Sequence, residues 1–148
     1  MENKPFHRPR TTSEIVRGRP RGLEKELFLT GLVVILGHAI GSFCDGYDRY
    51  FFLDVIVHFA AGAWVAFAVF AAFPSVKTAG GRKKILLSAI LAALLVGGVW
   101  EVFEFTVENV YPVDFQGPPL DTLSDLIIDA LGGLTAAFWI KPRGRLFR

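Results

Sequence analysis

Acidic residues and one histidine recur at helical spacing in three apolar stretches of this 148-residue chain. Because an α-helix turns once every 3.6 residues, positions that are three, four, seven or eight residues apart share one face. The groups that share a face in this way are Asp54 with His58, Glu101 with Glu104 and Glu108, and Asp121 with Asp125 and Asp129. Ionisable side chains within a membrane span are costly, so they indicate a functional site.

Clustered carboxylates in a medium of low dielectric need compensation, either by protonation or by a bound cation. Arg49 is the one basic residue predicted on their side of the membrane, so a divalent metal ion is the natural counter-charge. Carboxylates favour Mg²⁺, Mn²⁺ or Ca²⁺, and a histidine among them admits Zn²⁺. The predicted metal ligands are Asp54, His58, Glu101, Asp125 and Asp129, and the predicted catalytic residues are Glu101 and Glu104. Two alternatives stay open: protonated carboxyl groups that hydrogen-bond between helices, and a pathway for protons or cations.

The elements that must position these groups are membrane spans. Hydrophobic residues make up 52% of the chain and the mean hydropathy is +0.42, which is high for a soluble protein. Segments 27–43 and 55–76 contain no Asp, Glu, Lys or Arg, and a span needs about 20 apolar residues to cross a hydrocarbon core of about 30 Å. We predict an all-α, polytopic membrane protein with four transmembrane helices in a compact bundle, at about 24–43, 54–75, 85–110 and 121–140.

Basic residues are divided unequally between the predicted connections. Of the 16 Lys and Arg residues, seven precede the first span, four lie between the second and third spans and four follow the last, which leaves Arg49 alone on the other side. The positive-inside rule then predicts cytoplasmic termini in a bacterial cytoplasmic membrane, with the acidic groups toward the outer face. The expected organisation is a basic flexible tail (1–22), a transmembrane domain (23–141) and a basic cytoplasmic C-terminus (142–148).

The depth of each polar group follows from the helical rise of about 1.5 Å per residue. Counted from the cytoplasmic end of each span, His58, Glu101 and Asp125 fall in one layer, with Glu101 roughly 6 Å below the outer surface of the hydrocarbon core. His38 and Asp129 fall in a second layer, at a depth of roughly 13 Å. Because these counts come from four separate segments, we predict that the polar groups meet in space.

Three motifs carry a resemblance to a known group of proteins. They are Asp54-x3-His58-x3-Gly62 in the second span, Glu101-x2-Glu104 in the third, and Asp121-x3-Asp125-x3-Asp129-x2-Gly132 in the fourth. Over residues 50–135 the pattern resembles the VanZ-like and YjdF-like small bacterial membrane proteins. The likeness is closer to the YjdF-like group, because Glu104 stands where VanZ-like proteins often have glutamine. VanZ-like proteins are associated with resistance to glycopeptides, especially lipid-tailed teicoplanin.

Three functions fit this sequence. The first is a metal-dependent membrane enzyme that acts on a lipid or lipid-linked substrate, in which the metal activates water or polarises a phosphoryl or acyl group. The second is a non-catalytic envelope protein of the antibiotic-resistance type that binds a lipid-tailed compound, and the third is a small carrier of cations or protons. Membrane lipids are the expected partners, and a homodimer would supply the additional helices that a carrier needs. Nucleic acid is not an expected partner, because the Arg-rich segment is short and adjoins the membrane.

Overall fold

The computed structural model describes residues 22–79, 81–111 and 119–140. Within these ranges the chain is all-helical. The four long helices are α2 (Glu24–Phe43), α4 (Phe51–Ala72), α6 (Gly81–Val110) and α7 (Pro119–Trp139). Two short helices, α3 (Gly46–Arg49) and α5 (Pro74–Ala79), lie in the connections.

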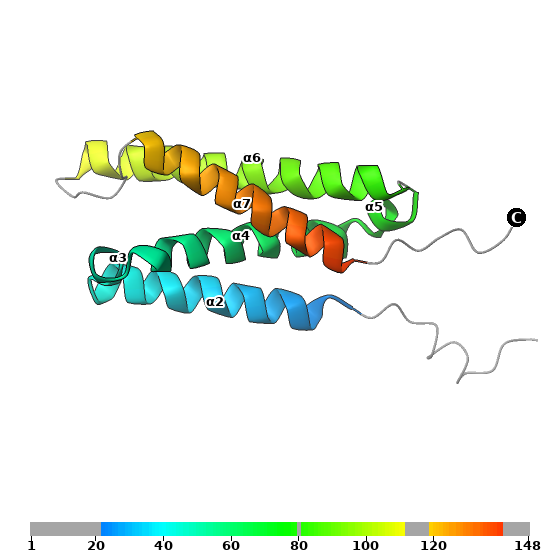
Figure 1. The fold of residues 1–148 in the computed structure, drawn as a ribbon, viewed down its shortest axis with the longest axis horizontal. Helices are drawn as coiled ribbons and strands as arrows, with labels where there is room; N and C mark the ends of the chain where they lie inside the picture. Colours follow the sequence, from blue (N-terminus) through cyan, green and yellow to red (C-terminus); the bar gives the residue numbers. More distant parts are fainter. Residues whose placement is uncertain (1–21, 80, 112–118, 141–148) are drawn as a thin grey trace, which may run out of the picture.

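The long helices form an up-and-down bundle in which α4 is the central element (Figure 1). Helix α4 packs against α2, α6 and α7, and α6 also packs against α7. The backbone of α2 approaches that of α4 closely, whereas α2 meets α6 and α7 through side chains, such as His38 with Trp100 and Glu26 with Trp139. In Figure 1, α2 begins and α7 ends at the same end of the bundle, and α3 lies at the opposite end.

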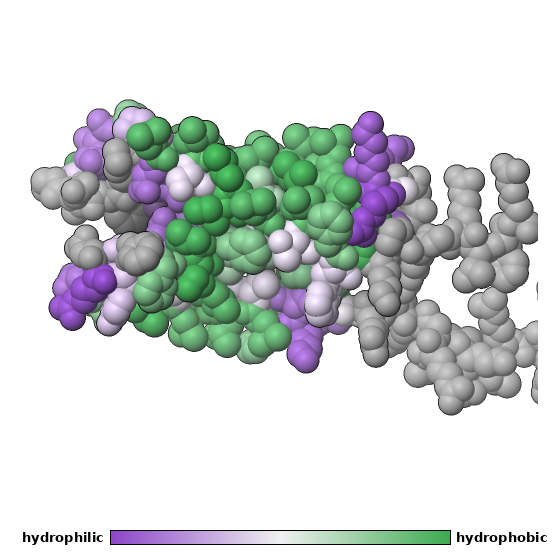
Figure 2. Space-filling model, viewed as in Figure 1, coloured by the Kyte–Doolittle hydropathy of each residue, from purple (hydrophilic) through white to green (hydrophobic). Residues whose placement is uncertain are grey.

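Three of the long helices, α2, α4 and α6, are long and apolar enough to cross a membrane. Helix α7 has 21 residues, which corresponds to about 31 Å, but three of its residues are aspartates. Figure 2 shows hydrophobic residues over the middle of the visible face and hydrophilic residues toward both ends. The predicted all-helical membrane protein is therefore confirmed, whereas a fourth span and the orientation of the termini stay predictions.

Prolines and glycines account for several helix ends. Phe73 leaves the helical conformation (φ −121°, ψ 75°) because the residue before a proline avoids it, so α4 ends at Ala72. Helix α7 begins at Pro119, where the missing N–H costs no helical hydrogen bond. Helix α6 begins at Gly81, whose φ of 58° suits a residue without a Cβ.

The helices differ in detail from the predicted spans. Helix α4 begins three residues before the predicted 54–75, α6 four residues before 85–110, and α7 two residues before 121–140. The predicted connections also contain α3 and α5, whose few residues carry no hydrophobic periodicity that would have indicated a helix. The predicted basic segments, 1–22 and 142–148, lie outside the described residues except for Gly22.

Close contact between α4 and α7 fixes the part of the bundle that carries the polar groups. A Cβ added to Gly62 would overlap the backbone carbonyl of Asp129, and one added to Gly132 would overlap the backbone carbonyl of Phe59. The two backbones can approach in this way only because both positions lack a side chain, as is common between membrane helices. The other half of the bundle is an apolar core that includes Phe70 and Ile85, both without exposed surface.

Candidate metal centre and its cavity

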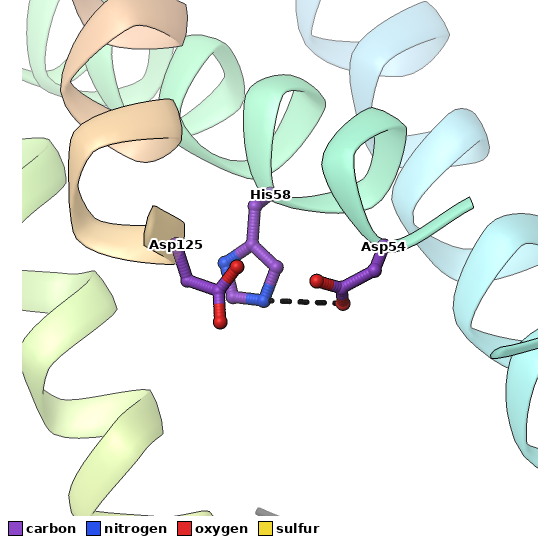
Figure 3. Close-up of side chains that lie close together, drawn as sticks. All are labelled: Asp54, His58 and Asp125. Carbon is purple, nitrogen blue, oxygen red and sulfur yellow. Dashed lines mark ion pairs between the residues drawn. The ribbon is translucent and has the colours of Figure 1, made fainter. Parts of the chain in front are cut away.

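Asp54, His58 and Asp125 form the centre of the polar region (Figure 3). Asp54 and His58 lie one turn apart on α4, and Asp125 comes from α7. One potential ligand atom from each residue lies within 4.8 Å of the others. Nε2 of His58 is 3.6 Å from Oδ1 of Asp54. His58 and Asp125 are buried, with 7% and 5% of their surfaces exposed, and Asp54 is partly exposed. Two carboxylates and an imidazole at this spacing could hold a divalent metal ion.

Asp129 contacts the other side of the His58 ring. Its Oδ2 is 3.5 Å from Nδ1 of His58, and the residue is buried one turn below Asp125 on α7. Gly97 of α6 provides the space for this carboxylate, because a Cβ at that position would overlap Oδ2 of Asp129. A carboxylate that accepts a hydrogen bond from one ring nitrogen fixes the ring and leaves the other nitrogen free to bind a metal. Asp129 is thus placed to orient His58.

Glu101 and Glu104 lie one turn apart on α6 and have different surroundings. Glu101 is 6% exposed, and among the described residues its Oε1 has no hydrogen-bond partner. Glu104 is partly exposed, and its Oε1 accepts a hydrogen bond of 2.8 Å from Nε1 of Trp100. An unpaired buried carboxylate oxygen is costly, so Glu101 is the group here that most needs a cation or a proton donor.

Tyr47 of α3 and His38 of α2 form a second polar contact at the same end of the bundle. Nδ1 of His38 and the Tyr47 hydroxyl are hydrogen-bonded at 2.9 Å, and the His38 ring meets Trp100 edge-on at 5.3 Å. Gly41 allows the tyrosine ring to lie on α2, because a Cβ there would overlap the ring. Burial, with smaller contributions from the nearby Asp54 and Glu104 carboxylates, raises the pKa of Tyr47 to about 12, so the hydroxyl is neutral at physiological pH.

A cavity of about 1040 Å³ joins all of these groups. It is lined by residues of α2, α3, α4, α6 and α7. Seven carboxyl groups and two histidines line it, whereas no Lys or Arg does so in the described part of the chain. The carboxyl groups thus outnumber the basic side chains of the described lining, which are the two histidines, and an excess of acidic groups is what a cation site requires.

The structure brings all of the predicted site residues to one cavity. Their contacts with one another differ from the layers that were predicted from helical rise. The predicted residues that line the cavity are Asp54, His58, Glu101, Glu104, Asp125 and Asp129, together with Asp121 and His38. The seventh carboxyl group of the lining belongs to Asp45, which was not predicted as part of the site. The depth count paired His38 with Asp129, whereas His38 is hydrogen-bonded to Tyr47 and Asp129 contacts His58. Glu101 and Asp129 lie outside the three-residue cluster that could hold a metal.

Two aromatic residues of this region were also not predicted as part of the site. Trp100 precedes Glu104 by one helical turn, a spacing at which two side chains meet, so this hydrogen bond could have been expected from the sequence. Tyr47 lies in the connection after α2, where no periodic pattern indicates the direction of a side chain.

Comparisons with known proteins place the chain in a family. A family model described as "Predicted membrane protein (DUF2238)" matches residues 15–144. An uncharacterized protein of Thermotoga maritima is 31% identical over 132 residues, a match that covers 84% of this chain and 67% of that protein. No solved structure matches the chain significantly. The narrower resemblance to VanZ-like and YjdF-like proteins stays a prediction. The chain belongs to the DUF2238 family of predicted membrane proteins.

Proposed function

We propose that this protein is a metal-dependent enzyme of the bacterial cytoplasmic membrane that acts on a lipid or lipid-linked substrate. The observation that carries the proposal is the convergence of Asp54, His58 and Asp125 within 4.8 Å in a large cavity. A second observation supports it independently: the buried Glu101 lines the same cavity with an unpaired carboxylate oxygen. A bound metal would polarise a phosphoryl or acyl oxygen or activate water.

The mixed set of donors favours Zn²⁺ or Mn²⁺ over Mg²⁺ or Ca²⁺, because imidazole is a poor ligand for the latter two. In a tetrahedral Zn²⁺ site with bonds of about 2.1 Å, ligand atoms lie about 3.4 Å apart. Nε2 of His58 and Oδ1 of Asp54 are already 3.6 Å apart, which is close to this spacing, and Asp125 offers a ligand atom within 4.8 Å of those of the other two residues. In this proposal Asp129 orients His58 and is a positioning residue.

Glu101 is the stronger candidate for a general base. Glu101 lines the cavity and its Oε1 is unpaired among the described residues, whereas Oε1 of Glu104 already accepts the Trp100 hydrogen bond. A general base must be free to accept a proton from the reacting group, and a free oxygen meets this need. The role proposed for Glu104 is therefore to hold Trp100 at the cavity wall.

We further propose that α7 is a fourth span and that both termini are cytoplasmic. The described basic residues at the end where α2 and α6 begin are Lys25, Lys77, Arg82, Lys83 and Lys84. At the opposite end, which holds the cavity, Arg49 is the single basic residue among those described. This asymmetry follows the positive-inside rule and supports an active site near the outer leaflet.

A non-catalytic role in binding a lipid-tailed compound, as the VanZ-like resemblance implies, uses the same cavity and is the main alternative. A carrier is less well supported. The half of the bundle beyond the cavity is filled by apolar residues, including Phe70, Ile85 and Ala89. A path for cations needs polar groups through the whole membrane, and the buried polar side chains of the described residues all line the cavity instead: His58, Glu101, Asp125 and Asp129.

The experiment that tests the enzyme compares lipids before and after incubation with the protein. The protein is reconstituted in vesicles of bacterial polar lipids, loaded with Zn²⁺ or Mn²⁺, and the lipids are analysed by mass spectrometry. We expect one lipid class to decrease and a product to accumulate, and we expect a chelator to stop the change. Asp125→Asn and Glu101→Gln are expected to abolish it.

Glu108→Gln is the matched control, because Glu108 lies on the same helix as Glu101 but does not line the cavity. It is expected to retain the activity of the unmodified protein. If the protein binds metal and no lipid class changes, the enzyme is refuted and the binding role replaces it.

A further inference from the structure

We infer that the apolar part of the cavity holds the hydrocarbon tail of a membrane amphiphile, which enters from the bilayer between α2 and α6. The inference rests on the proposed function only for the headgroup, which would be held at the metal. The tail site is argued from the shape, lining and exposure of the cavity.

The length of the cavity matches one leaflet of a bilayer. On α4 its lining extends from Asp54 to Val65, and on α6 from Glu104 back to Ala93. Eleven helical steps of about 1.5 Å give a length of about 16 Å. The hydrocarbon core of a bilayer is about 30 Å thick, so the cavity extends from the polar end of the bundle to about the middle of the membrane.

The two ends of the cavity differ in polarity. Most of the carboxyl groups and the histidines lie toward the end near α3, and Asp129 is the deepest of them, beside Gly62 and Gly97. The aliphatic residues of the lining lie level with Asp129 or beyond it: Val34, Ile35, Ala61, Val65, Ala93 and Val96. Water does not occupy a space with such a lining, because it finds no polar partners there. A hydrocarbon chain is the occupant that a bilayer supplies for it.

The apolar end is open toward the side of the bundle. Ile35 of α2 and Val96 of α6 both line the cavity, yet 67% and 48% of their surfaces are exposed. The backbones of α2 and α6 do not approach each other closely within the described residues, and the His38 and Trp100 rings join the two helices nearer the polar end of the cavity. A lateral opening between Ile35 and Val96 would lie on the apolar side of that ring contact. A lipid tail could pass through this opening without unfolding the bundle.

An amphiphile matches both ends of the cavity, whereas a helix from a second copy of the chain would place apolar residues against the carboxylates. The headgroup is constrained by charge. With seven carboxyl groups and no Lys or Arg in the described lining, the cavity repels an oxyanion unless a metal is bound. We therefore expect a phosphate or carboxylate headgroup to bind only when metal is present, and the tail to retain some affinity without it.

Photolabelling tests the tail site directly. The probe is lysophosphatidic acid with a diazirine in its acyl chain, added to the full-length protein in phosphatidylcholine nanodiscs, and labelled residues are located by mass spectrometry. We expect labels on cavity-lining residues of α2, α4 and α6. Val96→Trp should fill the lateral opening and lower this labelling about tenfold, which corresponds to ~1.4 kcal/mol.

Leu95→Trp is the matched control, because Leu95 is the neighbouring residue on α6, is 70% exposed and does not line the cavity. It should leave the labelling unchanged. Labels spread over the outward faces of the helices, with no effect of Val96→Trp, would overturn the inference. Cross-links between two copies of the chain at Ile35 and Val96 in place of lipid labels would also overturn it, because the second copy would then be the occupant.

Repeating the labelling with a chelator separates this inference from the proposed function. Labels in the cavity without any measurable metal binding would support the tail site and refute the metal-dependent enzyme. Metal binding without labels in the cavity would refute the tail site and leave the enzyme standing.

Discussion

Replacing Gly97 by alanine tests whether the Asp129 carboxylate orients His58. A Cβ at this position would overlap Oδ2 of Asp129, and the next atoms it would meet are Cγ of the same carboxylate at 3.1 Å and Cδ2 of Leu126 at 3.4 Å. The carboxylate must therefore move by about 1 Å before an ordinary van der Waals distance is restored. A shift of this size changes its contact with Nδ1 of His58, which is now 3.5 Å away.

The expected effect is a loss of metal affinity and not a loss of the fold. Removing the group that orients a metal-binding histidine lowers affinity by about 10–100-fold, or about 1.4–2.7 kcal/mol. The overlapping atom lies at the end of a side chain that can rotate, so the helices need not separate. The assay is titration of the detergent-purified protein with Zn²⁺ and Mn²⁺ by calorimetry.

Gly98→Ala is the control, because a Cβ on this neighbouring glycine meets no atom within 4 Å. It should bind metal like the unmodified protein. A double-mutant cycle tests whether Gly97→Ala acts through Asp129. In a protein that already carries Asp129→Ala, Gly97→Ala should cause no further loss of metal affinity. Unchanged metal affinity in Gly97→Ala, or an equal loss in both backgrounds, would refute the role given to Asp129.

Four further predictions concern the packing and stability of the fold. Gly62→Ala should lower stability by about 1–3 kcal/mol, because its Cβ would overlap the backbone of α7; a thermal melt unchanged from the unmodified protein would contradict this packing. Tyr47→Phe should remove an ionisation near pH 12 from a spectrophotometric tyrosine titration. The raised pKa of Tyr47 also predicts that stability falls as pH rises from about 10 to about 12, because the unfolded chain loses this proton first. Arg82→Met should destabilise the bundle by about 1–3 kcal/mol, because the Arg82 guanidinium donates hydrogen bonds to the carbonyls of Ala137 and Ile140; retention of the original melting temperature would show that these bonds contribute nothing.

Spacing and depth were enough to predict the helices and the common location of the acidic groups. Charge-free segments locate α2 and most of α4, and intervals of four residues place Asp54 with His58 and Asp125 with Asp129 on single faces. The count of helical rise gives the height of each group along the bundle axis. Because the predicted depths of His58 and Asp125 were the same, these two residues could be expected to lie close together although they belong to different helices, and in the structure they do.

The rotation of each helix about its own axis could not be obtained in this way. A depth count does not say which neighbour a side chain faces, and that direction depends on packing between helices. His38 and Asp129 have similar predicted depths, yet His38 faces Tyr47 and Asp129 faces His58. The space that Gly97 leaves for the Asp129 carboxylate also depends on this packing, and the sequence alone identifies it only as one of two adjacent glycines.

The most direct test of the central claim is the metal content of the purified protein, measured by elemental mass spectrometry beside Asp125→Asn. Glu108→Gln is the control, because Glu108 lies on α6 but does not line the cavity. We predict about one Zn²⁺ or Mn²⁺ per chain in the unmodified protein and in the control, and a loss of about tenfold or more in Asp125→Asn. Absence of metal after reloading, or equal metal in all three proteins, would contradict a metal site at Asp54, His58 and Asp125.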